Sequence, residues 1–342
     1  MKNNQLMIYG AYGYAGELMV REAVAQRLRP IIAGRDAEKL KPIATELSLE
    51  CRAFGVRNTG SNLQDISVLL NCAGPFSATA EPLARACLAQ QIHYLDITGE
   101  IDIFRKCHAL DEEARQQNVL ILPGAGTDIV PTDCLAAMLK EKLPVATRID
   151  LALSFGTNPS IGTVNTMIES FGKGGLIREG GMLKVVSNAF QMRKIPFQNK
   201  PQWAMTIPWG DVFTSGISTG VPDGAVYMAM PRMSIYMIRL TNPVKGILNT
   251  QFGQKITKRL AGWLMKKGPD AKALEAGRGQ FWGEAEAPDG EKLEMTMSTP
   301  NVYALTATVG IRIAQYCLDY TGPGGYYTPS MLLGCLLYTS PS

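Results

Sequence analysis

Short apolar runs alternate with helical patterns over the first 130 residues of the chain. Runs typical of buried strands lie at 5–10, 29–34, 51–54, 67–74, 92–98 and 119–124. Between them, apolar residues recur at helical spacing over 14–26, 37–47, 80–91 and roughly 101–117. Strands that alternate with helices of this length predict a parallel sheet covered by helices on both faces. We therefore predict an α/β fold in which residues 1–130 form a doubly wound Rossmann domain.

The pattern changes after about Arg148. Residues 148–155, "RIDLALSF", alternate between polar and apolar, which is typical of a half-exposed strand. Residues 281–299 contain two alternating segments around the turn residues Pro288-Asp289-Gly290, which indicates a hairpin. We therefore predict a second domain of the α+β kind over residues 131–300, built on a mixed sheet.

The end of the chain is predicted to return to the first domain. Residues 301–320 have a helical pattern, and we expect 301–334 to pack with the Rossmann domain. The last residues, 335–342, read "CLLYTSPS", which is similar to translated sequencing-adaptor read-through. We expect this tail to be non-native, with the native chain continuing past Gly334. A short disordered tail is the alternative.

Composition and charge exclude several classes of protein. The 342 residues are 46% hydrophobic and 19% charged, which is ordinary globular composition, and a net charge of +4 is too small to imply a nucleic-acid partner. The seven cysteines form no C-x-x-C pair, so we expect free thiols in a reducing compartment. Two histidines and no H-E-x-x-H predict no metal centre. The chain has no long apolar stretch and enters a strand almost at once, so we predict a cytoplasmic protein without a membrane span or signal peptide.

Three glycines stand between the first strand and the first helix. In "YGAYGYAGE", Gly10 permits a tight turn, Gly13 lets the backbone approach a pyrophosphate, and Gly16 allows close packing of helix on strand. The N-terminus of a helix carries partial positive charge, so this loop predicts a dinucleotide site. The alternative is a tight turn without a ligand. Backbone N–H groups that complete the predicted loop belong to Tyr12, Tyr14 and Ala15.

The second strand indicates which dinucleotide is bound. It ends at Gly34 with Arg35 next, and it has no acid at its tip to bond a ribose 2′-hydroxyl. An arginine there suits a 2′-phosphate, so we favour NADP(H) over NAD(H). Asp36 is predicted to cap the next helix. A shift of one residue would instead make Asp36 the ribose acid.

Polar residues follow three later strands at the edge where ligands of doubly wound sheets bind. Cys72, Ala73, Gly74 and Pro75 end one strand and are predicted to line the nicotinamide side. Asp96 and Glu100 follow the next strand, and Asp128 follows the last. We select these three carboxylates as candidates for proton transfer or substrate orientation. Loop bracing is the alternative role for Asp96.

These segments together resemble a known family. The set "GAYGYAGE", "AGRD", "CAGPF", "HYLDITGE" and "GTDIVPTD" is similar to the saccharopine dehydrogenase-like NADP-binding oxidoreductases. It is most similar to the compact bacterial branch that includes trans-acting enoyl reductases. Further matches are Ser160, Gly162, Thr163, Thr166, Glu169 and the "GPGGYYTPS" turn at 322–330. The resemblance implies a Rossmann domain, an inserted α+β domain on a mixed sheet and a C-terminal return.

The predicted activity is hydride transfer from the nicotinamide to a C=C, C=N or C=O bond of a small or acyl-chain substrate. Segments rich in Met, Phe and Trp in the second domain suit a lipid-like substrate, with core packing as the alternative. The basic amphipathic pattern at 253–270 predicts peripheral membrane contact or a solvated helix. A homodimer is compatible with the sequence. A non-catalytic NADP-binding sensor or assembly protein is the alternative function.

Overall fold

The computed structural model describes residues 4–155, 174–240, 242–244 and 277–334. The chain divides into two compact units. The first unit comprises Met1–Val130 and Tyr303–Ser342, and the second comprises Pro131–Val302. Three predictions lie outside the described residues: the basic helix at 253–270, the matches from Ser160 to Glu169, and the tail at 335–342.

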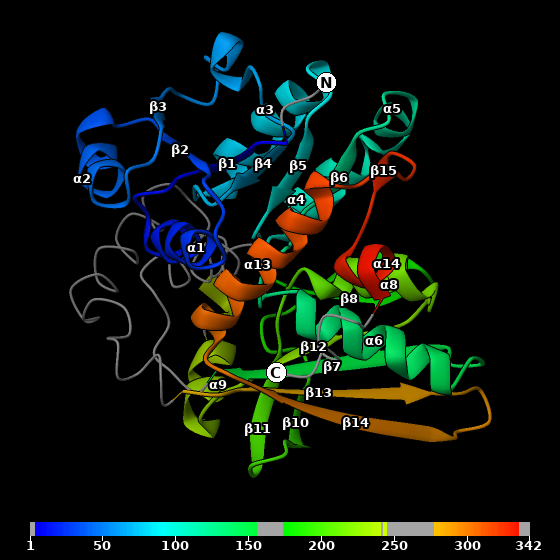
Figure 1. The fold of residues 1–342 in the computed structure, drawn as a ribbon. Helices are drawn as coiled ribbons and strands as arrows, with labels where there is room; N and C mark the ends of the chain where they lie inside the picture. The colour runs from blue at the N-terminus through cyan, green and yellow to red at the C-terminus, as the bar shows by residue number, and fades with distance from the viewer. Residues whose placement is uncertain (1–3, 156–173, 241, 245–276, 335–342) are drawn as a thin grey trace. The chain divides into compact units, whose positions relative to one another are not determined.

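The first unit is built on a seven-stranded parallel sheet with the order β15-β6-β5-β4-β1-β2-β3 (Figure 1). Its strands are β1 (Leu6–Tyr9), β2 (Ile31–Gly34), β3 (Cys51–Ala53), β4 (Val68–Asn71), β5 (His93–Asp96), β6 (Leu120–Leu122) and β15 (Gly325–Tyr326). Strand β1 lies between β2 and β4, and β3, β2, β1, β4, β5 and β6 follow the Rossmann order. The predicted parallel sheet is confirmed.

Helices cover both faces of this sheet. They are α1 (Tyr14–Ala25), α2 (Ala37–Leu47), α3 (Phe76–Ala89), α4 (Ile101–His108), α5 (Asp111–Gln116), α13 (Val302–Leu318) and α14 (Pro329–Leu333), with a 3-10 turn at Gly60–Leu63. Leu6 and Ile8 join residues of α1, α2 and α13 in one hydrophobic core, while α3 and α4 pack together elsewhere. All residues of β1, β2 and β4 are buried, as expected of strands covered on both sides.

Two sequence expectations for the first unit need correction. The single helix predicted at about 101–117 is two helices, because the amides of Ala109 and Leu110 close a turn onto Arg105 and Cys107 after α4. Helix α3 begins at Phe76, four residues before the predicted start, directly after Pro75 at its N-cap. Neither change alters the parallel sheet.

The second unit contains a six-stranded mixed sheet with the order β10-β11-β12-β7-β13-β14. Only the β12–β7 pair is parallel among its described pairs. The strands are β7 (Arg148–Phe155), β10 (Met192–Pro196), β11 (Pro201–Thr206), β12 (Val226–Ala229), β13 (Gly279–Glu286) and β14 (Lys292–Thr299). The other described elements are α6 (Val130–Lys142), β8 (Gly175–Glu179), β9 (Met182–Val186), α8 (Asp211–Thr219), α9 (Arg232–Leu240) and a 3-10 turn at Asn242–Val244. The predicted mixed sheet is confirmed.

The β13–β14 hairpin is confirmed, and its turn uses Gly290 at φ +90°. The prediction that 148–155 is half-exposed is wrong, because the interior of β7 is buried throughout. Strands β12 and β13 flank β7. The polar residues that alternate with apolar ones at the start of β7 form buried ion pairs rather than facing solvent.

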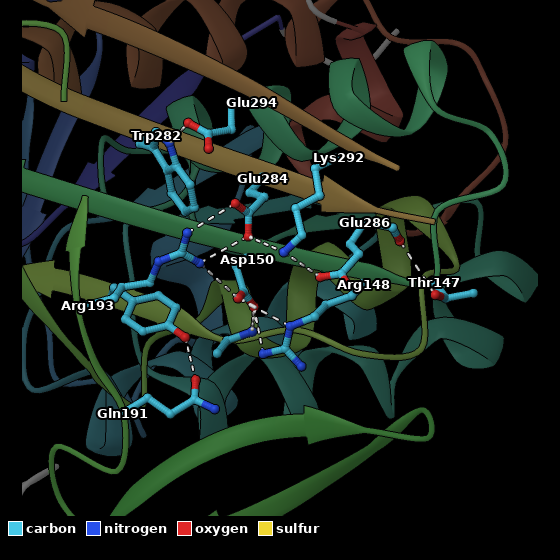
Figure 2. A network of polar contacts seen from close by, with 12 residues as sticks. Thr147, Arg148, Asp150, Gln191, Arg193, Trp282, Glu284, Glu286, Lys292 and Glu294 are labelled. Atoms are coloured by element: carbon cyan, nitrogen blue, oxygen red, sulfur yellow. Dashed lines mark hydrogen bonds and ion pairs between the residues drawn. The ribbon is translucent and has the colours of Figure 1, made fainter. Parts of the chain in front are cut away.

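A network of charged groups lies on one face of the mixed sheet (Figure 2). Asp150 of β7 and Glu284 of β13 are buried carboxylates. Arg193 donates to both oxygens of Glu284 at 3.1 Å, and its guanidinium carbon lies 4.6 Å from the Trp282 ring centroid. Arg148 pairs with Asp150 at 3.0 Å. Each buried carboxylate therefore has a cationic partner, which offsets the cost of its desolvation.

Candidate cofactor site

The glycine loop follows the carboxyl end of β1. Gly10 has φ +86°, and a Cβ there would lie 2.7 Å from the backbone nitrogen of Ala73. A Cβ on Gly16 would lie 2.2 Å from the carbonyl oxygen of Gly10. Both positions therefore require glycine, one for backbone conformation and close approach and the other for the packing of α1 on the loop. The positive φ of Gly10 and the close packing at Gly16 are what the glycine spacing predicts, whereas the approach of Gly10 to Ala73 depends on the distant strand β4.

The first turn of α1 has no side-chain cap. Gly13 occupies the N-cap position, and its own N–H donates to the carbonyl of Gly10 at 2.9 Å. Tyr14 and Ala15 then begin the helix, with the Tyr14 ring edge-on to Tyr303 at 5.1 Å. An anion at this end of the helix would meet backbone N–H groups and the positive end of the dipole. The loop therefore fits the pyrophosphate of a dinucleotide.

The end of β2 separates the roles of Arg35 and Asp36. The Asp36 carboxylate accepts from the backbone N–H groups of Glu38 and Lys39 at 3.1 and 3.3 Å, so the predicted cap is confirmed. Arg35 is exposed, and no described residue forms an ion pair or hydrogen bond with it. The side chain that stays available at this strand end is the cation rather than the acid.

The loop after β4 presents backbone rather than reactive side chains. Cys72 is buried, with its Sγ 3.2 Å from the sulfur of Met19, and burial raises the pKa of its thiol well above the ordinary value. Ala73 is half-buried, while Gly74 and Pro75 are exposed. A Cβ on Gly74 would meet nothing within 4 Å, so this side of the loop is open.

Asp96 lies at the end of β5 and is fully buried. One carboxylate oxygen accepts the N–H groups of Thr98 and Gly124 at 2.9 and 3.0 Å, and the other accepts the hydroxyl of Tyr94 at 2.9 Å. Burial raises the pKa of this carboxyl to about 6, although the three hydrogen bonds oppose the shift. Asp96 thus joins the ends of β5 and β6, which is the geometry of the bracing role.

Glu100 and Asp128 follow the same two strands and are less enclosed. Glu100 is half-buried, stands at the N-cap of α4, and donates its N–H to Thr98 Oγ1 at 3.1 Å. Asp128 is half-buried in the turn after β6, and burial raises the pKa of its carboxyl to about 7. A carboxyl that titrates near neutral pH suits proton transfer. The roles of both residues stay predictions.

Sequence reasoning missed the polar network beneath these strand ends. Asn71 is fully buried at the end of β4. Its amide donates to Thr79 and to Tyr94 at 3.2 Å each, and its oxygen accepts the N–H of Ala73 at 3.0 Å. The signal was an asparagine directly after a run of buried apolar residues, since a buried amide must be hydrogen-bonded. Through Tyr94, Asn71 links the loop after β4 to Asp96.

Within the described ranges, no cluster of three or more His, Cys, Asp or Glu side chains is arranged to hold a metal ion. No helix in those ranges is both long and apolar enough to span a bilayer.

Comparison with known proteins confirms the resemblance seen in the sequence. Residues 6–122 match the family model described as the saccharopine dehydrogenase NADP binding domain, which confirms NADP(H) as the cofactor. A saccharopine dehydrogenase-like oxidoreductase of Rattus norvegicus is 26% identical over 231 residues, which are 59% of this chain and 53% of the relative. A provisionally named trans-acting enoyl reductase of Mycobacterium tuberculosis is 28% identical over 206 residues, which are 54% of this chain and 44% of that protein. The chain spans about half the length of these relatives.

The fold is also that of a solved enzyme structure. Saccharopine dehydrogenase (L-Glu forming) of Saccharomyces cerevisiae superposes with a TM-score of 0.64 at 10% identity, over 97% of this chain and 96% of that chain. At this identity, the likeness concerns the fold alone.

Proposed function

We propose that this chain, whose residues 6–122 match the saccharopine dehydrogenase NADP binding domain, is an oxidoreductase that reduces a C=C, C=N or C=O bond of a small or acyl-chain substrate. The observation that carries this proposal is the uncapped glycine loop beside an exposed arginine whose neighbouring acid is held in a helix cap. When bound, NADPH supplies the hydride. The protein then has to hold the cofactor and deliver a proton.

The glycine loop and Arg35 are the proposed cofactor contacts. Gly10, Gly13 and Gly16 admit the pyrophosphate, which accepts hydrogen bonds from the backbone of Tyr12, Tyr14 and Ala15. Arg35 pairs with the 2′-phosphate. Cys72, Ala73, Gly74 and Pro75 line the nicotinamide side through their backbone, supported by the open side of Gly74 and the inward Cys72 thiol.

Among the three candidate carboxylates, we assign proton transfer to Asp128. Its pKa near neutral pH allows it to hold a proton and release it under ordinary conditions. Glu100 is proposed to orient the substrate. Asp96 is proposed to position the strand ends, because each of its oxygens already accepts a hydrogen bond within the protein.

An acyl-chain or lipid-like substrate is supported by the second unit. Many of its large apolar residues form the core, among them Phe197 and Met205. Others remain exposed on α9 at helical spacing: Met233, Tyr236, Met237 and Leu240. Methionine surfaces adapt to apolar ligands. The same stripe, which includes no acidic residue, supports the predicted peripheral membrane contact.

Turnover with defined acceptors tests the reaction. Loss of NADPH fluorescence is measured with an enoyl thioester, a cyclic imine and a ketone, each with short and long chains. Wild-type protein should oxidise NADPH with at least one acceptor, and Asp128→Asn should lose most of the turnover while binding NADPH unchanged. Binding of NADPH without turnover of any acceptor would favour the alternative of a non-catalytic sensor or assembly protein. Sedimentation velocity tests the homodimer, and co-sedimentation with liposomes tests the membrane contact.

A further inference from the structure

Two cations and the Tyr12 ring lie near the end of β2. Arg35 follows the last residue of β2, and its charge reaches Tyr9, where it partly opposes the rise in the pKa of that phenol. Lys39, in the first turn of α2, places its Nζ 5.7 Å from the centroid of the Tyr12 ring. Tyr12 is also close enough to Tyr9 to raise its pKa. Arg35, Lys39 and Tyr12 therefore share one neighbourhood beside the glycine loop.

Gly34 creates the place for the aromatic ring. A Cβ on Gly34 would lie 2.6 Å from Cε1 of Tyr12, so the ring lies directly against the backbone of β2. The ring is half-buried against the core formed by β1, α1 and α2. The Lys39 ammonium lies over this ring. An aromatic ring beside an exposed cation is the arrangement on which a planar base can stack.

Asp36 contacts Lys39 through a backbone hydrogen bond and a weak ion pair, so the Lys39 ammonium remains able to bind another anion. The Asp36 carboxylate accepts the Lys39 N–H at 3.3 Å and lies 3.6 Å from the Lys39 ammonium. The Lys39 and Asp36 side chains are 66% and 38% exposed. An exposed pair at this distance is weak and leaves the ammonium free to gain a stronger anionic partner.

We propose that Lys39 is a second cation for the 2′-phosphate of NADP(H), with the Tyr12 ring as the platform for the adenine; this rests on the proposed cofactor site. A phosphate monoester carries about −1.5 to −2 charges near neutral pH, which one arginine does not neutralise. The planar Arg35 guanidinium can donate two parallel hydrogen bonds to a phosphate, and the Lys39 ammonium adds a compact positive charge. NADH lacks the phosphate, and Asp36 is held in the α2 cap rather than free to bond the ribose hydroxyl. The pair therefore selects NADPH over NADH.

Lys41 provides a matched control on the same helix. It is 64% exposed and pairs with Glu38 at 2.6 Å, two residues beyond Lys39. Lys39→Gln and Lys41→Gln remove the same charge from α2 and change the net charge of the protein equally. Affinities for NADPH, NADH, 2′,5′-ADP and 5′-AMP are measured by titration calorimetry at low and high salt, with thermal unfolding as the check on folding.

Lys39→Gln should weaken NADPH and 2′,5′-ADP about tenfold, as expected for the loss of one charge-assisted contact. It should leave NADH and 5′-AMP within about twofold, and the effect on NADPH should shrink at high salt. Lys39→Arg should retain most of the affinity, and Lys41→Gln should behave as wild type. Equal weakening of all four ligands, or the same loss with Lys41→Gln, would overturn the role of Lys39. A wild-type protein that binds NADPH selectively but reduces no acceptor would overturn the proposed reaction and leave the Lys39 assignment standing.

Discussion

Replacing Asp96 with Asn should change how stability depends on pH. The Asp96 side chain is fully buried, and burial raises its carboxyl pKa from 3.8 to about 6. The folded protein thus holds this proton more tightly than the unfolded chain does. The associated stability is present in full below pH 3.8 and is lost as the pH rises through about 6. At about 1.36 kcal/mol per pKa unit, the wild-type protein loses about 3 kcal/mol across this window.

Asparagine removes this pH dependence but disturbs a hydrogen bond. Its oxygen can accept the N–H groups of Thr98 and Gly124, as the carboxylate does. Its NH2 group then faces the Tyr94 hydroxyl, which loses the acceptor for its own proton. A buried unsatisfied donor costs about 1–3 kcal/mol. The variant should therefore be less stable than wild type at pH 5, with a difference that closes as the pH rises.

Urea unfolding at pH 5, 6, 7 and 8, followed by far-UV circular dichroism, measures this difference. The stability gap between wild type and Asp96→Asn should narrow by about 1.4 kcal/mol from pH 5 to pH 8. Asp128 titrates in both proteins, so its contribution to the pH dependence of stability cancels in the difference between them. All four tryptophans lie in the second unit, so their fluorescence provides an internal control for that unit. A gap that stays constant or widens with pH would refute the argument.

Three further substitutions test other parts of the structure. Gly16→Ala places a Cβ 2.2 Å from the Gly10 carbonyl, so it should displace the loop, abolish NADPH binding in titration and lower the free energy of unfolding by about 1–3 kcal/mol; unchanged binding would contradict this packing. Glu284→Ala leaves the Arg193 guanidinium without its two-pronged partner and should destabilise the second unit by about 3 kcal/mol, seen in tryptophan fluorescence during urea unfolding. Arg35→Ala should weaken NADPH but not NADH, and equal losses in titration would remove the 2′-phosphate assignment.

The sequence predicted those features that depend on local backbone chemistry. The contact of Gly16 with the Gly10 carbonyl lies within one strand–turn–helix, so it follows from the spacing alone. Asp36 caps the helix directly after it, which again needs no information from distant residues. Lys39 was missed although it stands one helical turn after Arg35, because only the position of Tyr12 shows that its charge is near the cofactor loop.

Features that depend on distant strands could not be predicted. The bracing geometry of Asp96 requires Gly124, which lies 28 residues away on the loop after the neighbouring strand. The burial of β7 depends on β12 and β13, and β13 comes about 130 residues later. Polar alternation in β7 had two explanations, solvent on one face or buried ion pairs. Only the register with Glu284 and the position of Arg193 decide between them.

In the first unit, a buried hydrogen-bonded network fixes the strand ends, and a few exposed side chains are proposed to select between NADPH and NADH. Asn71, Tyr94 and Asp96 form one hydrogen-bonded chain across the ends of β4, β5 and β6. Such a buried network fixes the loops above it, because each member is costly to leave unsatisfied. The loop after β4 presents backbone, glycine and proline rather than reactive side chains. We propose that Arg35 and Lys39 then determine the choice of cofactor. Substitutions at these exposed sites should therefore change selectivity with little effect on folding, whereas changes in the buried network should alter folding more than selectivity.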